Sequence, residues 1–288
     1  MTGPGADVRI TGVAVGGAGV AREPSGRVLF VDGAIPGELV GVELVAERRD
    51  HARAVAVDVV EAAPSRVAPP CPFVAAGCGG CGWQHIDPAA QRSLKVELVA
   101  DALRRLGGVG EPQVTVGPAL ATIGYRTTLR GVADEAGRFS LRRHVSHHLV
   151  AVPGCLVAHP LVVEVLAEGR FPPGAEVTVR AGARTGERLV VVDELPGEGT
   201  GGDVAVPAGV RVVTGAELAA GKRAWLHEEV AGVRLRVSAR SFFQAGPEGA
   251  EALIAVVGAA VGDVGDGRRA GADRAAGGTP GRRAMVVP

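Results

Sequence analysis

The sequence predicts an α+β protein with a small N-terminal β-barrel, a larger α+β domain containing a mostly antiparallel sheet, and a disordered C-terminal tail. Short β-rich runs separated by turn residues fill residues 7–61. Strand-like runs mixed with helical segments occupy residues 62–240. From residue 262 onward the chain is rich in Gly, Ala and Arg, and it has almost no large apolar residue before Met285.

Composition limits the classes of protein to consider. The chain has 288 residues, 47% of them hydrophobic, which is enough for two domains with buried cores. Its formal net charge is zero, so any contact with nucleic acid has to come from local basic patches. We expect no membrane span and no secretion signal, and therefore a cytoplasmic protein in which structural disulfides are disfavoured.

Several short runs support the barrel. Val28–Val31 is an apolar run, residues 40–44 alternate apolar and polar as a half-buried strand does, and residues 54–60 are again β-rich. The glycine-rich stretch at residues 16–19 is interpreted as a turn. Arg22 stands where a dinucleotide-binding loop requires glycine, and no helix pattern follows it.

Helix signals are clear at three places. Asp87 is a favourable N-cap before Pro88, and Gly107 with Gly108 closes the helix that follows. A short helix is predicted over residues 160–168 and another over residues 247–261. The strand-like runs of this region are 188–192, 210–213 and 233–237.

All four cysteines fall in loops rich in glycine and proline: Cys71, Cys78, Cys81 and Cys155. Cys78 and Cys81 have the C-x-x-C spacing that lets two thiolates converge on one metal. Gly79 and Gly80 leave room beside the sulfur atoms, so that backbone N–H groups can point at them. From spacing alone, an iron–sulfur cluster and a structural zinc are equally favoured. Ordinary buried cysteines and a redox pair are less favoured.

The segment from Cys71 through Cys78-Gly79-Gly80-Cys81-Gly82-Trp83-Gln84-His85 resembles the cluster-binding signature of the 23S rRNA (uracil-5-)-methyltransferase family. Residues 31–38 resemble part of that family's N-terminal TRAM domain, an OB-like RNA-binding barrel. Further similarity to the family's central domain occurs at Tyr125-Arg126, Phe139, Ser146-His147 and the Cys155 loop. Ser241-Phe242-Phe243-Gln244 resembles the segment that introduces its methyltransferase domain.

The resemblance, which covers about residues 7–260, implies specific roles. The four cysteines become ligands of a [4Fe–4S] cluster, Gln244 becomes a contact to S-adenosylmethionine, and structured RNA, either rRNA or tRNA, becomes the partner. The implied domains are a TRAM barrel over residues 7–61, a central domain over 62–240, an incomplete methyltransferase segment over 241–261 and a tail over 262–288.

The sequence departs from the family in its C-terminal part. No strand followed by a glycine-rich loop appears after Gly258, and the four cysteines present are already assigned as ligands. We therefore expect the chain to lack the catalytic domain and to be inactive by itself. The alternative is a non-catalytic RNA-binding module with a structural metal or iron–sulfur site. A frameshift or truncation is one explanation of the tail.

The densest basic stretch is Arg142-Arg143-His144 with His147-His148. Such a stretch is most often a solvated face, but it also has the charge needed to neutralise RNA phosphates. Arg126 and Arg130 are candidates to join it. Trp83 is expected to be core packing, and Glu228 and Glu229 are expected at the surface. The sequence does not predict which RNA or base is bound, or the oligomeric state.

Overall fold

The computed structural model describes residues 7–144, 146–193, 203–270 and 284–287. The chain divides into two compact units. Unit 1 contains residues 1–70, 81–116 and 282–287, and unit 2 contains residues 71–80 and 117–281. In the part of the chain that the structure describes, no helix combines the length and apolar character that crossing a bilayer requires.

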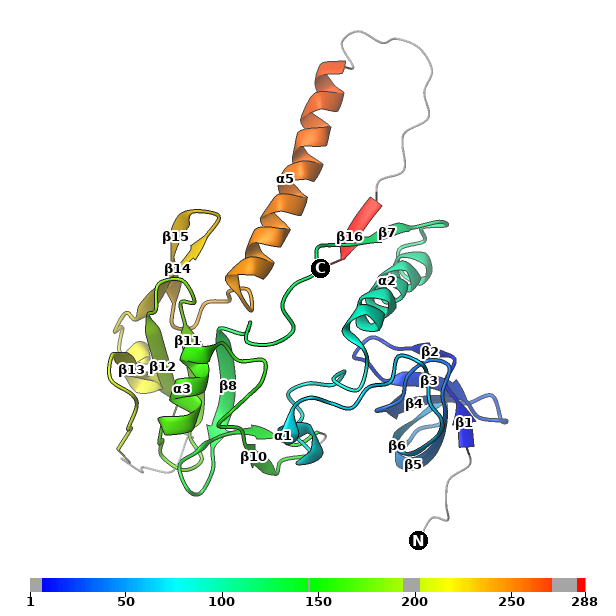
Figure 1. The fold of residues 1–288 in the computed structure, drawn as a ribbon, viewed down its shortest axis with the longest axis horizontal. Coiled ribbons are helices and arrows are strands. Elements are labelled where there is room, and N and C mark those ends of the chain that lie inside the picture. Colours follow the sequence, from blue (N-terminus) through cyan, green and yellow to red (C-terminus); the bar gives the residue numbers. More distant parts are fainter. Residues whose placement is uncertain (1–6, 145, 194–202, 271–283, 288) are drawn as a thin grey trace. The chain divides into compact units, whose positions relative to one another are not determined.

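A six-stranded sheet forms the first part of unit 1, with the strand order β1-β5-β6-β4-β3-β2. Its strands are β1 (Asp7–Arg9), β2 (Gly12–Val13), β3 (Gly19–Arg22), β4 (Val28–Asp32), β5 (Leu39–Glu47) and β6 (His51–Glu61). Neighbours are antiparallel except for β4 and β6. Thr11 joins β1 to β2, and its N–H donates to the Val20 carbonyl on β3 over 2.8 Å, so the sheet curls toward closure (Figure 1).

The inside of this curled sheet is apolar. Its buried residues alternate with outward-facing ones along the strands, as the pleat requires. They are Val8, Ile10, Ala21, Leu29, Val31, Ala34, Val40, Val42, Ala52 and Ala54. The turn between β2 and β3 is the one predicted from its glycines, because Gly16 and Gly17 both have positive φ.

A buried carboxylate ties the connector after β6 to the sheet. Glu38 has no exposed surface and accepts hydrogen bonds from the N–H groups of Ile35 (2.9 Å) and Ala63 (3.2 Å). Arg66 donates to both of its carboxylate oxygens, over 2.5 and 2.6 Å. Burial raises the pKa of Glu38, but the Arg66 and backbone hydrogen bonds outweigh it and hold the pKa below its ordinary value.

The helix α2 (Pro88–Arg105) begins as predicted. The Asp87 side chain accepts from the N–H groups of Ala89 and Ala90 and so caps the first turn. Only Leu94 of this helix is buried, and it packs with Ile35, Ala63 and Ile86. After α2, β7 (Gln113–Val116) pairs in parallel with β16 (Ala284–Val287).

Unit 2 is built on a second six-stranded sheet, of order β10-β9-β8-β11-β12-β13. Its strands are β8 (Thr128–Ala133), β9 (Phe139–Arg142), β10 (Leu149–Ala151), β11 (Glu176–Ala181), β12 (Arg188–Asp193) and β13 (Val210–Thr214). Every neighbouring pair is antiparallel except β12 and β13, so the predicted mostly antiparallel sheet is confirmed. The predicted helix at residues 160–168 is α3 (Pro160–Glu168), which packs on β11.

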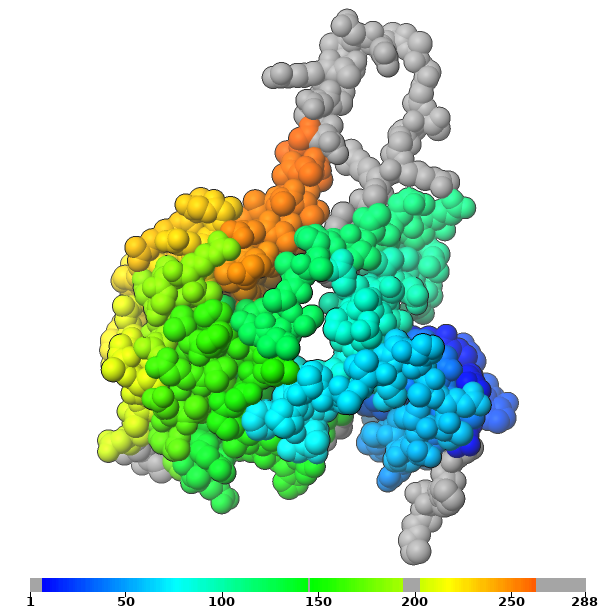
Figure 2. Space-filling model, viewed as in Figure 1, coloured from blue at the N-terminus to red at the C-terminus, as the bar shows by residue number. Residues whose placement is uncertain are grey.

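A hairpin and two helices complete unit 2: β14 (Trp225–Val230), β15 (Val233–Ser238), α4 (Gly215–Ala219) and α5 (Pro247–Ala270). The inner face of the hairpin, with Leu226 and Val237, joins Leu189, Val191 and Val213 of the sheet in one apolar cluster. In the space-filling view the start of α5 (orange) lies against the hairpin (Figure 2).

The boundaries differ from the predicted ones in two places. The predicted central domain of residues 62–240 is divided, since residues 81–116 pack with unit 1. The predicted disordered tail is wrong for residues 262–270, which continue α5, and for residues 284–287, which form β16. Residues 262–270 hold three glycines and one alanine, and they follow a helix that is already nucleated, so adding residues to it costs less than starting a new helix. Residues 271–283 and 288 lie outside the described part.

Candidate nucleic-acid interface and cysteine loops

In unit 2, the segment that holds the first two cysteines is a tight loop around one helical turn. Cys71 is the N-cap residue of α1 (Pro72–Ala75). The Cys78 N–H donates to the Phe73 carbonyl over 2.9 Å, which folds the loop back on itself. Gly77 has φ of +88°, a conformation that an L side chain rarely adopts, so the reversal needs glycine at this position.

This loop pairs with the end of β9 through its backbone. Cys78 forms a β-bridge with Arg143. The Gly79 N–H donates to the Arg142 carbonyl over 3.0 Å, and a Cβ added at Gly79 would lie 3.0 Å from that oxygen. The Gly79 N–H is therefore committed to a strand carbonyl. Glycine is needed here for the close approach of two backbones.

The Cys155 loop lies against the same helical turn. A Cβ added at Gly154 would be 4.0 Å from the Phe73 ring, which places the residue before Cys155 beside α1. The Ala158 N–H donates to the Cys155 carbonyl over 3.1 Å and closes the loop. Cys71 and Cys155 are buried, and Cys78 is half-buried. Two sequence-distant cysteine loops thus meet within unit 2.

The fit of these residues to a metal or cluster is partial. Across residues 7–144, 146–193, 203–270 and 284–287, no three Cys, His, Asp or Glu side chains are grouped so that they could hold a metal ion. Cys81 is half-buried and belongs to unit 1, whereas the other three cysteines belong to unit 2. Within unit 2, the structure brings the Cys155 loop to the turn that Cys71 caps.

Beside the cysteine loop, the β9–β10 connection presents the basic stretch found in the sequence. We call Arg142, Arg143, His144, His147 and His148 the basic loop, and all five are exposed. The Arg143 N–H donates to the His148 carbonyl over 2.8 Å, which holds the two sides of the connection together. A Cβ added at Gly77 would lie 2.6 Å from Arg143 Nε, so this guanidinium rests on the cysteine loop.

The two arginines expected to join the basic loop differ from its residues, one by an ion pair and the other by partial burial. Arg130 forms an ion pair with Glu176, which neutralises its charge. Arg126 is half-buried, and its N–H donates to the Val157 carbonyl over 2.8 Å. The cationic surface of this region is therefore narrower than the sequence suggests.

Gln244 lies in a segment held at both ends. The Ala245 carbonyl accepts from the Thr127 N–H over 2.7 Å, and a Cβ added at Gly246 would lie 2.6 Å from the Tyr125 carbonyl. Phe243 packs on the apolar cluster of the hairpin, whereas Phe242 is 85% exposed. Gln244 itself is half-buried, so its side chain is positioned but retains exposed surface.

The aromatic and imidazole groups that follow Cys81 have local roles in unit 1. Trp83 Nε1 donates to the Gly17 carbonyl over 3.0 Å, and its ring packs beside Ile86 and Leu94, as the core-packing prediction expects. The Nε2 atom of His85 is buried and has no hydrogen-bond partner among the described residues. Burial, with the nearby Arg66 charge, lowers the pKa of His85 below its usual value.

Sequence reasoning missed the buried polar groups of unit 2. The sequence predicts Glu228 at the surface, but it is 1% exposed and accepts from the N–H groups of Ala183 (2.7 Å), Arg184 (3.1 Å) and Glu229 (3.0 Å). A signal for its burial exists, because Leu226, Glu228 and Val230 share the buried face of β14. Arg180 is also buried, and it donates to the Ser238 and Ala239 carbonyls.

Comparison with known proteins confirms the resemblance to RNA methyltransferases. The chain is 36% identical over 272 residues to a protein of Streptomyces avermitilis named as an uncharacterized RNA methyltransferase, covering 87% of this chain and 62% of that one. A similarly named protein of Streptomyces coelicolor is 36% identical over 279 residues, covering 89% and 60%. A 23S rRNA (uracil(1939)-C(5))-methyltransferase of Alkalilimnicola ehrlichii is 35% identical over 180 residues, covering 60% and 40%.

Among solved structures, the chain resembles the Pyrococcus abyssi tRNA (uracil-54, C5)-methyltransferase in complex with S-adenosyl-L-homocysteine. The TM-score is 0.55 at 19% identity, covering 88% of this chain and 64% of that one, and this likeness concerns the fold alone. No protein-family profile matches the chain. The chain spans about three fifths of the length of the two Streptomyces relatives.

Proposed function

We propose that the chain is part of an RNA methyltransferase that uses S-adenosylmethionine to methylate C5 of uracil in rRNA or tRNA. The observation that carries this proposal is 36% identity across 87% of the chain to a protein named as an RNA methyltransferase. A solved relative in fold was crystallised with S-adenosyl-L-homocysteine, the product of methyl donation. The family's N-terminal RNA-binding TRAM barrel corresponds in this proposal to the curled sheet β1–β6.

Within unit 2, the basic loop is the proposed RNA contact. Arg142 and Arg143 are exposed, whereas other arginines of the unit, such as Arg130, Arg138 and Arg184, are paired with carboxylates. A guanidinium that is not neutralised by the protein can take a phosphate oxygen and release a counterion. The chain has no net charge, so binding depends on such local groups.

The direct test measures binding of a fluorescein-labelled rRNA stem-loop by anisotropy. The double variant Arg142→Ala/Arg143→Ala should bind about tenfold more weakly, because two phosphates then have no cation beside them. The control Arg104→Ala/Arg138→Ala removes two exposed arginines that are each paired with an aspartate, and it should bind like the wild type. Equal weakening by both double variants would exclude the basic loop as a specific contact.

The four cysteines are the proposed ligands of a [4Fe–4S] cluster, with a structural role. The C-x-x-C spacing, the burial of Cys71 and Cys155 and the approach of the Cys155 loop to α1 support this proposal. A cluster of this kind would contribute to folding, since its ligands come from loops far apart in the sequence.

The cluster is tested on protein purified without oxygen, by measuring iron, acid-labile sulfide and visible absorption. The wild type should contain about four iron atoms per chain, and Cys155→Ser should lower that content. An alanine at Ser146, which lies in the neighbouring basic loop region, is the control and should retain it. Stoichiometric zinc without iron would overturn the cluster and leave a zinc site as the explanation of the motif.

Gln244 is the proposed contact to S-adenosylmethionine. Its segment is anchored by Thr127 and Gly246, so the side chain is held at a defined place. In calorimetric titration with S-adenosyl-L-homocysteine, Gln244→Ala should weaken binding by about fivefold, the loss of one hydrogen bond. Gln113→Ala on β7 is the control with unchanged affinity. Identical affinities of the wild type and Gln244→Ala would remove this assignment.

A second candidate function is RNA binding without catalysis, and one observation favours it. Methylation at uracil C5 needs a thiolate that adds to C6, and all four cysteines of the chain are proposed cluster ligands. Incubation of the RNA with the chain and S-adenosylmethionine, followed by mass spectrometry of nucleosides, separates the two functions. Formation of 5-methyluridine establishes the enzyme, whereas tight binding without 5-methyluridine establishes the binding module.

A further inference from the structure

The hairpin β14–β15 has two chemically different faces. The inner face is apolar and packs on the sheet of unit 2. On the outer face, the antiparallel register places Trp225 opposite Ser238, His227 opposite Arg236 and Glu229 opposite Arg234. We call these residues, with the adjoining Arg211 and Glu187, the outer face of the hairpin. Neither the basic loop nor the cysteine loops belong to it.

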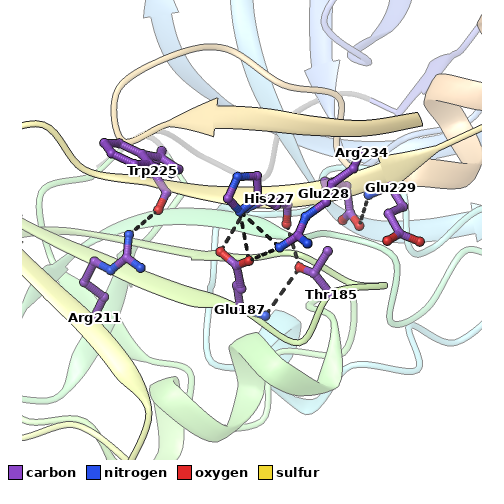
Figure 3. Close-up of polar contacts among 8 residues, drawn as sticks. All are labelled: Thr185, Glu187, Arg211, Trp225, His227, Glu228, Glu229 and Arg234. Carbon is purple, nitrogen blue, oxygen red and sulfur yellow. Dashed lines mark hydrogen bonds and ion pairs between the residues drawn. The ribbon is translucent and has the colours of Figure 1, made fainter. Parts of the chain in front are cut away.

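An arginine–tryptophan pair lies at one end of this face. Cζ of Arg236 is 5.3 Å from the ring centroid of Trp225, within the range of a cation–π contact. The Arg211 guanidinium donates to the Trp225 carbonyl over 2.6 Å and so fixes the backbone beneath the ring. Trp225 is half-buried, and Arg236 and Arg211 are exposed. Figure 3 shows Arg211 next to Trp225 at one end of the polar cluster.

The charges of the outer face do not cancel. The two carboxylates that face it are Glu187 and Glu229. Glu187 accepts from Arg234 over 3.0 Å and lies 2.9 Å from His227 Nδ1, so its charge is compensated within the cluster (Figure 3). Arg211 is held by a backbone carbonyl and Arg236 by an aromatic ring, so these contacts leave both positive charges uncompensated.

We infer that the outer face of the hairpin binds single-stranded RNA, with a base stacked on the Trp225–Arg236 pair and a phosphate on Arg211. Indole and guanidinium planes are the surfaces on which unpaired bases stack, and stacking tolerates any base. The adjoining Arg211 meets the charge of the backbone between stacked bases. The inference rests on the proposed RNA-directed function and adds a site for an unpaired stretch next to the structured part of the RNA.

Tryptophan fluorescence gives a direct test, because the chain has only two tryptophans, Trp83 and Trp225. In Trp83→Phe, Trp225 is the single reporter. A 12-nucleotide oligouridylate should quench its emission in proportion to binding, since a stacked base quenches indole. An abasic ribose-phosphate oligomer of the same length should bind through its charge without quenching. Quenching by neither, or equally by both, would overturn base stacking on Trp225.

Arginine variants in the wild-type background separate charge from stacking and do not depend on the tryptophan substitution. Arg236→Ala should weaken oligouridylate binding by about tenfold, and Arg236→Lys should restore only part of it, since lysine keeps the charge but lacks the planar group. Arg138→Ala, an exposed arginine paired with Asp134, is the control with unchanged affinity. Full rescue by lysine would mean that only charge matters and would overturn the stacking site.

Two further outcomes distinguish this inference from the proposed function. If Arg142→Ala/Arg143→Ala weakens binding of the stem-loop while Arg236→Ala leaves oligouridylate binding unchanged, the outer face is not an RNA site and the proposed function stands. If an acidic peptide quenches Trp225 and displaces oligouridylate with higher affinity, the face is a protein-binding surface and the inference fails.

Discussion

At the scale of single residues, two buried glutamates show how this chain satisfies charge away from water. Glu38 and Glu228 are almost completely buried, and each accepts at least two backbone N–H groups. Glu38 also accepts hydrogen bonds from Arg66 on both carboxylate oxygens, whereas Glu228 accepts from backbone N–H groups. Buried carboxylates are tolerated only when their oxygens are paired in this way.

We predict that Glu38→Gln lowers the free energy of unfolding by about 2 to 4 kcal/mol at neutral pH, because the Arg66 charge loses its partner inside unit 1. The pKa of Glu38 is held below its ordinary value of 4.5. The stabilisation is therefore fully present above pH 4.5 and is lost as the pH falls through the lower pKa of the folded state. Urea unfolding measured from pH 7 to pH 3 checks both statements.

The control for this prediction is Glu97→Gln on the exposed side of α2. It removes the same charge from the same unit and should change stability by less than about 0.5 kcal/mol. A destabilisation by Glu38→Gln no greater than that by Glu97→Gln would show that the buried pair does not stabilise unit 1.

The turn of the hairpin contains a strained residue. Ala231 has φ of +49° and is followed by Gly232 at +76°, which is the conformation of a two-residue type I′ turn. Ala231 is exposed. Because asparagine adopts this conformation at lower cost than alanine, Ala231→Asn should stabilise the protein by about 0.5 to 1 kcal/mol. Thermal unfolding of the variant and the wild type measures this gain.

The matched control adds a side chain at the neighbouring position, Gly232. A Cβ added at Gly232 meets no atom within 4 Å, so Gly232→Ala tests backbone strain alone. It should destabilise by about 1 kcal/mol. If both variants shifted stability in the same direction, the strain account of this turn would be wrong.

At the scale of elements, the start of α5 is tied to the hairpin by one carboxylate. Glu251 accepts from Arg184 over 2.5 and 2.8 Å and from the Ala231 N–H over 2.8 Å. It therefore links α5 both to the turn at residues 182–186 and to the strained turn of the hairpin. The Arg184 hydrogen bonds and the Ala231 N–H lower the pKa of Glu251 to about 2.

The contribution of Glu251 to stability should appear as a different pH dependence of the melting temperature in the wild type and in Glu251→Gln. Glu251→Gln should lower the melting temperature of unit 2 at pH 7, and the decrease should be equal at all pH values above the ordinary pKa of 4.5. As the pH falls through about 2, the wild type loses the same stabilisation, so its melting temperature should approach that of Glu251→Gln. Differential scanning calorimetry follows this. A difference that persisted unchanged below pH 2 would contradict the ionic origin of the link.

Sequence patterns predicted elements well where local signals agree. The cap at Asp87, the apolar run of β4, the strand at β5 and the boundaries of α3 all follow from chemistry within a few residues. The extent of α5 was not predictable in this way, because its glycines argued for disorder. The buried Glu228 and Arg180 were missed because their partners are backbone groups about 45 to 60 residues away.

The sequence pointed to the residues of the candidate site, but it did not predict the contacts between their loops. The spacing of the cysteine motif pointed to a loop, and the structure shows that loop paired with β9 and touched by the Cys155 loop. The glycines were predicted to leave room beside the sulfur atoms, and the structure adds that Gly79 permits the close approach of two backbones. Long-range pairing of this kind leaves no periodic signal in a single sequence.

At the scale of the whole molecule, the chain has no net charge, and two surfaces of unit 2, the basic loop and the outer face of the hairpin, present exposed arginines. Because the chain is similar to proteins named as RNA methyltransferases, we propose RNA as the partner of both surfaces. We propose above all that the basic loop contacts RNA phosphates.

The most direct measurement of that claim is the salt dependence of stem-loop binding. The slope of the logarithm of the binding constant against the logarithm of the salt concentration counts the counterions released. Arg142→Ala/Arg143→Ala should make this slope shallower by about 2, one for each arginine that no longer neutralises a phosphate, and Arg104→Ala/Arg138→Ala should leave it unchanged. An unchanged slope in Arg142→Ala/Arg143→Ala would contradict the claim that this loop binds RNA.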